Sequence, residues 1–350
     1  VNFPATYSIN LLYKKMPAMQ FGIIGSGSWA TALAKILTDN NHRINWWIRN
    51  ADTIRYVQQR RHNPHYLSNA YFDSQLLEMS SSIGYVIENS DVLIIAVPSA
   101  YIHNVLSTLH TDVFKNKKIV SAIKGLLPGS NQLLNEFLEQ KFNIKLEDYF
   151  AVVGPCHAEE VAAEKLSYLT FCGVDETMAA EIATHFSNEY LNTVVSHDIM
   201  GVQYAAVLKN IYALGAGIAH GLEYGDNFLS VYIANSANEM VRFLRKARLD
   251  EDSSGLNYAA SAYLGDLLVT CYSLYSRNRT FGNMIGKGYS VKAAQLELNM
   301  VAEGYNASRC IHTTSRELQA TVPIADSIYD ILWQHVPATE GFKNIEAVLV

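Results

Sequence analysis

Short apolar runs alternate with segments of helical periodicity through the first half of the chain. Two of the runs, at residues 92–97 (VLIIAV) and 118–123 (KIVSAI), are apolar almost throughout, as strands are when both faces of a sheet are covered. Because strands and helices alternate, the pattern predicts an α/β fold with a doubly wound, mostly parallel sheet. The other expected strands lie at residues 20–24, 43–48, 149–153, 168–172 and 193–195, and the expected helices at residues 29–37, 54–59, 131–140 and 178–187.

The pattern changes after about residue 197, where helical periodicity continues without any further strand. We therefore expect three parts: an N-terminal extension at residues 1–18, an α/β domain at 19–197 and an all-α domain at 198–350. Neither a repeat nor a Pro-rich linker separates the two domains, so the cleft between them is the expected ligand site. The helices are expected at residues 201–221, 232–248, 258–275, 291–298 and 313–318.

Composition narrows the classes of function. The 350 residues carry a net charge of -6, which argues against a nucleic-acid-binding or membrane-surface protein. The uncharged stretch at residues 92–111 is interrupted by Pro98, Ser99, His103 and Asn104, so stable membrane insertion is not expected. Residues 1–18 lack the charge order of a secretory signal, and the chain is expected in the cytoplasm. The four cysteines form no CxxC pair, so neither a zinc site nor a disulfide is expected.

A glycine-rich turn, GxGxxA, joins the first expected strand to the first helix. Gly25 would allow the tight turn, Gly27 would let the backbone approach a pyrophosphate, and Ala30 would keep helix and strand close. A turn of this kind can be purely structural. Its place at the start of a strand–helix–strand unit favours dinucleotide binding, and therefore a Rossmann domain.

The second expected strand ends at Arg49, where NAD-binding domains usually carry an acidic residue. The arginine could be a solvated side chain at a strand end. Alternatively it could meet the 2′-phosphate of NADP. We expect NADP or NAD as the cofactor, with a preference for NADP.

Two lysines lie at positions from which their side chains could contact a bound ligand. Lys124 follows the strand at residues 118–123, at the sheet edge where ligands of open α/β sheets bind, although it could equally be a solvated turn residue. Lys209 interrupts the nearly apolar helix at residues 201–221. It could extend toward solvent at a helix rim, but a lysine buried there would have a lowered pKa suited to proton transfer.

A third polar cluster begins at Asp266 and continues with Ser276, Arg277 and Asn278. The glycines that follow, at positions 282, 286 and 288, suggest a flexible loop after a helix end. Guanidinium groups bind phosphate in a bidentate manner, so the cluster is a candidate phosphate receptor. Taken alone, the cluster is better explained as a solvated loop with two arginines.

Several blocks resemble the NAD(P)-dependent glycerol-3-phosphate dehydrogenase family of the bacterial type, in the family's order. They are GSGSWATALA, AVPS, SAIKGL, GPCHAEEVA, LKNIYALGAGI, GDLLVTCYSLYSRNRTFG and VAEGY, spanning about residues 19 to 340. The combination of LKN and SRNRxFG is specific to that family, whereas GxGxxA is not. The resemblance implies a Rossmann domain followed by a helical domain like that of 6-phosphogluconate dehydrogenase, in a homodimer.

The resemblance also assigns residues. It implies dinucleotide contacts from Ser28, Trp29, Arg49, Lys124, Ala158, Arg277, Val301 and Glu303, in addition to Gly25 and Gly27. It implies substrate contacts from Lys124, Gly154, Cys156, Lys209, Asp266, Ser276, Arg277 and Asn278, with Lys209 as the proton acceptor. Three departures from the family pattern bear on the site. Cys156 replaces a serine or threonine, and Asn50 replaces a second basic residue after Arg49. Ala30 replaces the third glycine of the turn, which the dinucleotide fingerprint tolerates.

The expected reaction follows from these assignments. Dihydroxyacetone phosphate would place its phosphate on Arg277 and Asn278, and its carbonyl between Lys124 and Lys209, with Asp266 orienting Lys209. The product, sn-glycerol 3-phosphate, would feed glycerophospholipid synthesis. The alternatives are a related 3-hydroxy-acid or sugar-acid dehydrogenase and a non-catalytic NAD(P)-binding sensor. The three cationic residues argue against a sensor.

Overall fold

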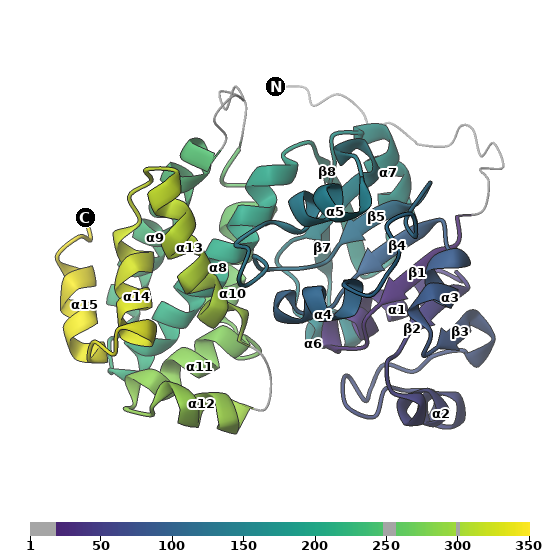
Figure 1. Ribbon diagram of the computed structural model, residues 1–350. Helices are drawn as coiled ribbons and strands as arrows, with labels where there is room; N and C mark the ends of the chain where they lie inside the picture. The colour runs from purple at the N-terminus through teal and green to yellow at the C-terminus, as the bar shows by residue number, and fades with distance from the viewer. Residues whose placement is uncertain (1–18, 248–256, 299–301) are drawn as a thin grey trace, which may run out of the picture.

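The computed structural model describes residues 19–247, 257–298 and 302–350. The extension expected at residues 1–18, the last residue of the helix expected at 232–248, and Val301 lie outside the described residues. Within these ranges the chain forms an α/β part and a helical part, side by side in Figure 1.

An eight-stranded sheet has the order β3-β2-β1-β4-β5-β6-β7-β8. Every neighbouring pair is parallel except β6 and β7, so the expected doubly wound, mostly parallel sheet is confirmed. Strand β3 was not predicted, because only its first residue is buried. The strands are β1 (Phe21–Ile24), β2 (Ile44–Trp47), β3 (Leu77–Ser80), β4 (Val92–Ile95), β5 (Lys118–Ser121), β6 (Tyr149–Val153), β7 (Ser167–Cys172) and β8 (Leu191–Ser196).

The sheet is buried on both faces, as its apolar strands predict. In β4, Val92 and Ile94 belong to one hydrophobic cluster, whereas Leu93 and Ile95 belong to the other. Successive residues of a strand point to opposite faces, so the two clusters are the two covered faces of the sheet. The helices of this part are α1 (Ser28–Asp39), α2 (Ala51–Arg60), α3 (Ile83–Glu88), α4 (Ile102–Leu106), α5 (Leu134–Phe142), α6 (Ala158–Ala162) and α7 (Glu176–Thr184).

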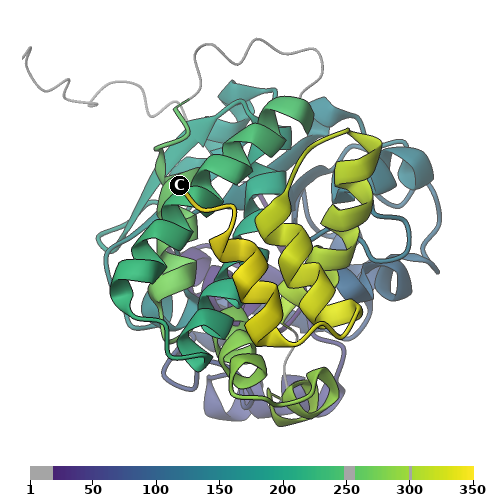
Figure 2. The ribbon, with the colours of Figure 1, turned by 90° about the vertical axis from the view of Figure 1, so that its left-hand side faces the viewer.

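Helix α8 (Ile199–Gly221) is the centre of the helical part, and its residues from Gly201 to Ala219 are buried. Five other helices described between residues 226 and 333 pack against it, and Figure 2 shows the helical part in front of the α/β part. Helix α8 also meets the sheet, where Tyr149 of β6 donates a hydrogen bond to Gln203 at 2.7 Å. The other helices are α9 (Asp226–Ala247), α10 (Asp266–Tyr272), α11 (Arg277–Gly286), α12 (Val291–Leu298), α13 (Glu303–Glu317), α14 (Pro323–Trp333) and α15 (Ala338–Glu346). Among the described helices, none has the length and apolar character of a membrane span.

The expectation for residues 258–275 and the loop after them was wrong in two respects. The expected single helix is a five-residue π-helical turn, Ser261–Gly265, followed by α10, which ends at Tyr272. The expected flexible loop is helix α11, which begins after Ser276, whose side chain accepts a hydrogen bond from the Arg279 N–H at 3.3 Å. The serine cap, rather than any change in hydrophobic pattern, sets this helix start.

Glycines of α11 pack against α8, and glycines of α8 pack against α11. A Cβ atom at Gly282 would overlap the carbonyl oxygen of Leu214, and one at Gly286 would overlap that of Ile218. From the other side, a Cβ at Gly217 would overlap the carbonyl oxygen of Arg279. The two backbones are therefore in direct contact, and two of the three glycines that suggested flexibility serve close helix packing. The third, Gly288, follows the helix with φ +90° and has open space beside it.

Candidate active site

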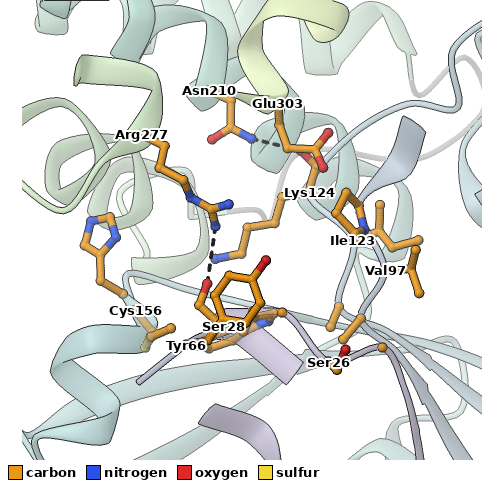
Figure 3. Close-up of a pocket in the computed structure, with 18 of the residues that line it drawn as sticks. Ser26, Ser28, Tyr66, Val97, Ile123, Lys124, Cys156, Asn210, Arg277 and Glu303 are labelled. Carbon is orange, nitrogen blue, oxygen red and sulfur yellow. Dashed lines mark hydrogen bonds between the residues drawn. The ribbon is translucent and has the colours of Figure 1, made fainter. Parts of the chain in front are cut away.

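A cavity of about 530 Å³ lies between the sheet edge and the helical part. Figure 3 shows its wall, with Ser26 and Ser28 on one side and Asn210, Arg277 and Glu303 on the other. Of the residues expected in the site, those lining the cavity are Gly25, Gly27, Ser28, Trp29, Arg49, Lys124, Cys156, Ala158, Lys209, Ser276, Arg277, Asn278 and Glu303. Asp266 lies behind Lys209, and Gly154 precedes Cys156 in the turn after β6. Val301 lies outside the described residues.

Three side chains hold the glycine-rich turn by its carbonyl groups. The Trp46 indole N–H donates to the Gly25 carbonyl at 2.7 Å, the Asn63 amide to the Ser26 carbonyl at 3.1 Å, and the Thr31 hydroxyl to the Gly27 carbonyl at 2.9 Å. Because a trans peptide directs its N–H opposite its C=O, the N–H groups of the turn face the other way. They are thus available to an anion at the start of α1. The residues of this turn fit the diphosphate of a dinucleotide.

Arg49 is an exposed residue of the cavity wall, which the half-buried Trp47 and Tyr66 also line. Its neighbour Asn50 has a structural task, since its side chain accepts the Asp52 N–H at 2.7 Å and caps α2. At the position where the family pattern has a second basic residue, this chain therefore has the N-cap of α2. Arg49 is the cationic group at this end of the cavity.

Lys209 and Asp266 form a buried ion pair, with the side chains 4% and 2% exposed. Burial is the main cause that lowers the pKa of Lys209, to about 8, and the positive charge of Lys124 acts in the same direction. The Asp266 carboxylate opposes both by raising it. Thr270, one turn later in α10, donates to the Asp266 carbonyl at 2.5 Å. A lysine in this state can hold or release a proton near neutral pH.

Lys124 reaches the cavity from the end of β5. Its ammonium lies over the ring of Trp29, 4.8 Å from the centroid, in a cation–π contact with the first turn of α1. Its backbone carbonyl accepts a hydrogen bond from the Asn210 side chain at 2.8 Å. The two lysines are thus tied to each other through adjacent positions of α8.

Asn278 and Asn210 continue this chain of hydrogen bonds. The Gly304 backbone N–H donates to the side-chain oxygen Oδ1 of Asn278 at 2.9 Å. The side-chain amide of Asn278 in turn donates to Oδ1 of Asn210 at 2.9 Å. Both ends of the Asn278 carboxamide therefore have protein partners, and one N–H of its amide remains for a ligand.

Cys156 and His157 are neutral side chains of the wall. The Cys156 thiol donates to the Tyr168 carbonyl at 3.1 Å, and burial raises its pKa to about 11. Burial, followed by the charges of Lys124 and Lys209, lowers the pKa of His157 to about 4. Neither side chain adds charge at neutral pH, so the two lysines and Arg277 supply the positive charge of the inner cavity.

Two contacts cross the cavity from the helical part to the sheet edge. Arg277 lies 3.5 Å from the Ser28 hydroxyl, at the start of α1 (Figure 3). The Glu303 carboxylate accepts the Ser99 hydroxyl at 2.6 Å and the Ser99 N–H at 3.2 Å. Burial raises the pKa of Glu303, while these hydrogen bonds and the charge of Arg277 lower it.

Several lining residues and their partners received no role from sequence reasoning, and four of them matter to the geometry described above. Asn210 could have been found, because it follows Lys209 within the family-specific LKN block. Thr270 lies one helical turn after Asp266, a spacing that places both on one face. Nothing in the local sequence pointed to Ser99 as the partner of Glu303, or to Tyr66 as part of the wall. Among the described residues, no group of three or more His, Cys, Asp or Glu side chains could hold a metal ion.

The sheet, the glycine-rich turn and the buried lysine define a class: a Rossmann-fold dehydrogenase that uses a nicotinamide dinucleotide. The family model for the N-terminus of NAD-dependent glycerol-3-phosphate dehydrogenase matches residues 20–179, and the model for its C-terminus matches residues 198–343. The chain belongs to the NAD-dependent glycerol-3-phosphate dehydrogenase family.

Individual relatives agree over most of the length. The glycerol-3-phosphate dehydrogenase [NAD(P)+] of Lacticaseibacillus paracasei is 32% identical over 325 residues, which cover 91% of this chain and 92% of the relative. That of Streptococcus equi subsp. equi is 33% identical over 332 residues, covering 94% and 96%. The crystal structure of glycerol-3-phosphate dehydrogenase from Coxiella burnetii superposes with a TM-score of 0.86 at 25% identity, covering 94% of this chain and 98% of that one.

Proposed function

We propose that the chain interconverts dihydroxyacetone phosphate and sn-glycerol 3-phosphate with NAD(P)H or NAD(P)+. The observation that carries the proposal is the position of Lys209. This buried lysine, ion-paired with Asp266, lines the same cavity as the glycine-rich turn. A proton donor and a dinucleotide site are the two elements that reduction of a carbonyl requires.

The substrate phosphate binds at the start of α11. Ser276, Arg277 and Asn278 all line the cavity there. Arg277 supplies a charged donor, and the first turn of the helix adds backbone N–H groups. This local positive site attracts a phosphate to a protein whose net charge is -6.

The carbonyl of the substrate lies between the two lysines. When bound, the reduced nicotinamide supplies a hydride to C2. Lys209 gives its proton to the carbonyl oxygen during reduction and takes it back during oxidation. Lys124 stabilises the negative charge that develops on that oxygen, and Asp266 orients Lys209. Cys156 and Gly154 shape the wall beside the substrate, and the neutral thiol adds no charge.

Cofactor choice depends on Arg49, which we propose meets the 2′-phosphate of NADP. The Arg49→Asp variant should raise the KM for NADPH much more than the KM for NADH. Equal effects on both would restrict Arg49 to a structural role and would withdraw the preference for NADP. The remaining dinucleotide contacts in this proposal come from Ser28, Trp29, Lys124, Ala158, Arg277 and Glu303.

The direct test is NAD(P)H oxidation with dihydroxyacetone phosphate, dihydroxyacetone and a panel of keto acids. The phosphorylated substrate should be strongly preferred. The Arg277→Leu variant should lower kcat/KM for it by about 10–150-fold, the value of one charge-assisted hydrogen bond. Equal turnover of dihydroxyacetone and its phosphate would show that the site at the start of α11 is not a phosphate receptor. Preference for a keto acid would show that dihydroxyacetone phosphate is not the substrate.

The same proposal extends to the domains, the assembly, the compartment and the fate of the product. Residues 19–197 form the dinucleotide-binding domain, and residues 198–350 form the substrate and dimerisation domain. The chain acts as a homodimer in the cytoplasm, and its product enters glycerophospholipid synthesis. The homodimer rests on the family resemblance. The four cysteines, all free and buried, fit a reducing compartment.

A further inference from the structure

The segment between α2 and β3 contains a side chain in the cavity that the proposed reaction does not use. Tyr66 lines the cavity beside the glycine-rich turn, and Figure 3 places it next to Ser28. Its ring is half-buried, and its hydroxyl makes no hydrogen bond within the part of the chain that the structure describes. A phenol in that position can donate to whatever occupies the turn.

The segment that carries Tyr66 is built into the fold. Its base is closed by the Phe72 N–H, which donates to the Arg61 carbonyl at 2.8 Å. The Phe72 ring is buried and packs on Trp46, with 5.4 Å between the centroids. Trp46 is the residue that holds the Gly25 carbonyl. The segment and the turn therefore share one support.

Asn63 fixes the segment to the turn with a defined polarity. Its side-chain oxygen accepts the His65 N–H at 3.0 Å, a group that can only donate. Its amide must then face the Ser26 carbonyl, at 3.1 Å, and the Thr31 hydroxyl oxygen, at 2.9 Å. The Thr31 hydroxyl itself donates a hydrogen bond to the Gly27 carbonyl. The Asn63 side chain is fully buried, and its bond to Thr31 is buried with it.

We propose that Tyr66 is a further dinucleotide-binding residue, which donates its hydroxyl to the diphosphate held by the glycine-rich turn, and that Asn63 positions it. The inference rests on the proposed function, because it assumes that a dinucleotide occupies the turn. It assigns Tyr66 to the diphosphate, which NAD and NADP share, and leaves the 2′-phosphate to Arg49.

The test measures cofactor binding alone, by titration of NADH and NADPH fluorescence without substrate. Tyr66→Phe should raise the Kd for both cofactors by the same factor, about 10-fold or more, since one charge-assisted hydrogen bond is lost. Tyr71→Phe is the matched control, because Tyr71 lies in the same segment but is 64% exposed and does not line the cavity.

Asn63→Asp tests the positioning role. A carboxylate cannot donate to the Ser26 carbonyl or to Thr31, so the Kd for both cofactors should rise at least as much as in Tyr66→Phe. If Asn63 only supports the fold, the melting temperature would fall while the folded fraction bound both cofactors with wild-type affinity.

The outcomes separate the two proposals. A Tyr66→Phe variant with normal Kd values would overturn the inference, and so would a loss confined to NADPH, which would move the contact to the 2′-phosphate. Wild-type protein that bound neither cofactor would instead overturn the proposed function.

Discussion

Gly25 and Gly27 both belong to the glycine-rich turn, but they differ in backbone conformation and in the space around their Cα atoms. Gly25 has φ +126°, and a Cβ there would lie 2.6 Å from the Ala96 carbonyl oxygen. Gly27 has φ -75°, and a Cβ there would meet nothing within 4 Å. The fold therefore requires the first glycine, whereas only a ligand requires the second.

This difference gives a paired prediction. Gly25→Ala should lower the free energy of unfolding by more than about 1–3 kcal/mol, because the clash adds to the backbone strain. Gly27→Ala should melt at the wild-type temperature but bind NADH at least about 10-fold more weakly, since the added methyl group keeps the diphosphate from the turn. Thermal melts and cofactor titrations distinguish them, and wild-type affinity in Gly27→Ala would contradict the assignment.

Lys209 should impose a pH dependence on both directions of the reaction. Reduction needs its protonated form, so kcat for reduction should fall as pH rises through about 8, whereas kcat for oxidation should rise through the same range. Asp266 raises the pKa of Lys209, and so Asp266→Asn should move both inflections to lower pH. The check is kcat against pH in each direction. An inflection that Asp266→Asn leaves in place would assign it to another group.

How far the sequence predicted the site depends on how local each cause is. Lys209 stood out because its own helix is apolar, and that helix is buried. Its partner Asp266 is 57 residues away, and no local pattern joins the two positions. The family resemblance, not the hydrophobic pattern, suggested the pair. Tyr66 and Ser99 were missed because their importance comes from neighbours that the fold brings from elsewhere.

At the level of elements, the central strands β1, β4, β5 and β6 were predicted well because burial on both faces leaves an almost unbroken apolar run. Strand β3, which has one buried residue, was missed. Helix ends were predicted poorly because capping side chains and single backbone bonds set them. The glycines of α11 show the limit most clearly. The same residue type serves a flexible loop and the closest possible helix contact, and only the facing helix decides between them.

The contact between α8 and α11 sets the spacing between Lys209 and Arg277. Gly282→Ala should push α11 away from α8, because its Cβ would overlap the Leu214 carbonyl oxygen. Overpacking of this kind costs about 1–3 kcal/mol, so the melting temperature should fall. The kcat/KM for dihydroxyacetone phosphate should fall by at least about 10-fold, since a misplaced phosphate misplaces the carbonyl.

The matched control is Gly84→Ala in α3, where a Cβ would have only the Ser82 hydroxyl, 4.0 Å away, as a neighbour. That variant should keep wild-type activity and stability. Wild-type kcat/KM in Gly282→Ala would show that the spacing of the two helices does not govern the reaction.

On the scale of the whole molecule, the two-part architecture followed from the change of pattern near residue 197. The closure of the cavity did not, because it depends on a few side chains that reach across it. Arg277 meets Ser28, Glu303 meets Ser99, and Asn210 meets the Lys124 carbonyl. These contacts join residues between 86 and 249 positions apart, which no local periodicity can connect.

The buried ion pair in the wall of the cavity also sets stability against activity. Two charges taken out of water recover in their attraction only part of what they lose in hydration. Lys209→Met alone should destabilise the protein by about 3–5 kcal/mol, because it strands the Asp266 carboxylate. The double variant Lys209→Met, Asp266→Leu should melt at or above the wild-type temperature while having no dehydrogenase activity. A double variant no more stable than the single one would contradict this. If it holds, the enzyme keeps at its centre a pair that its fold would be more stable without.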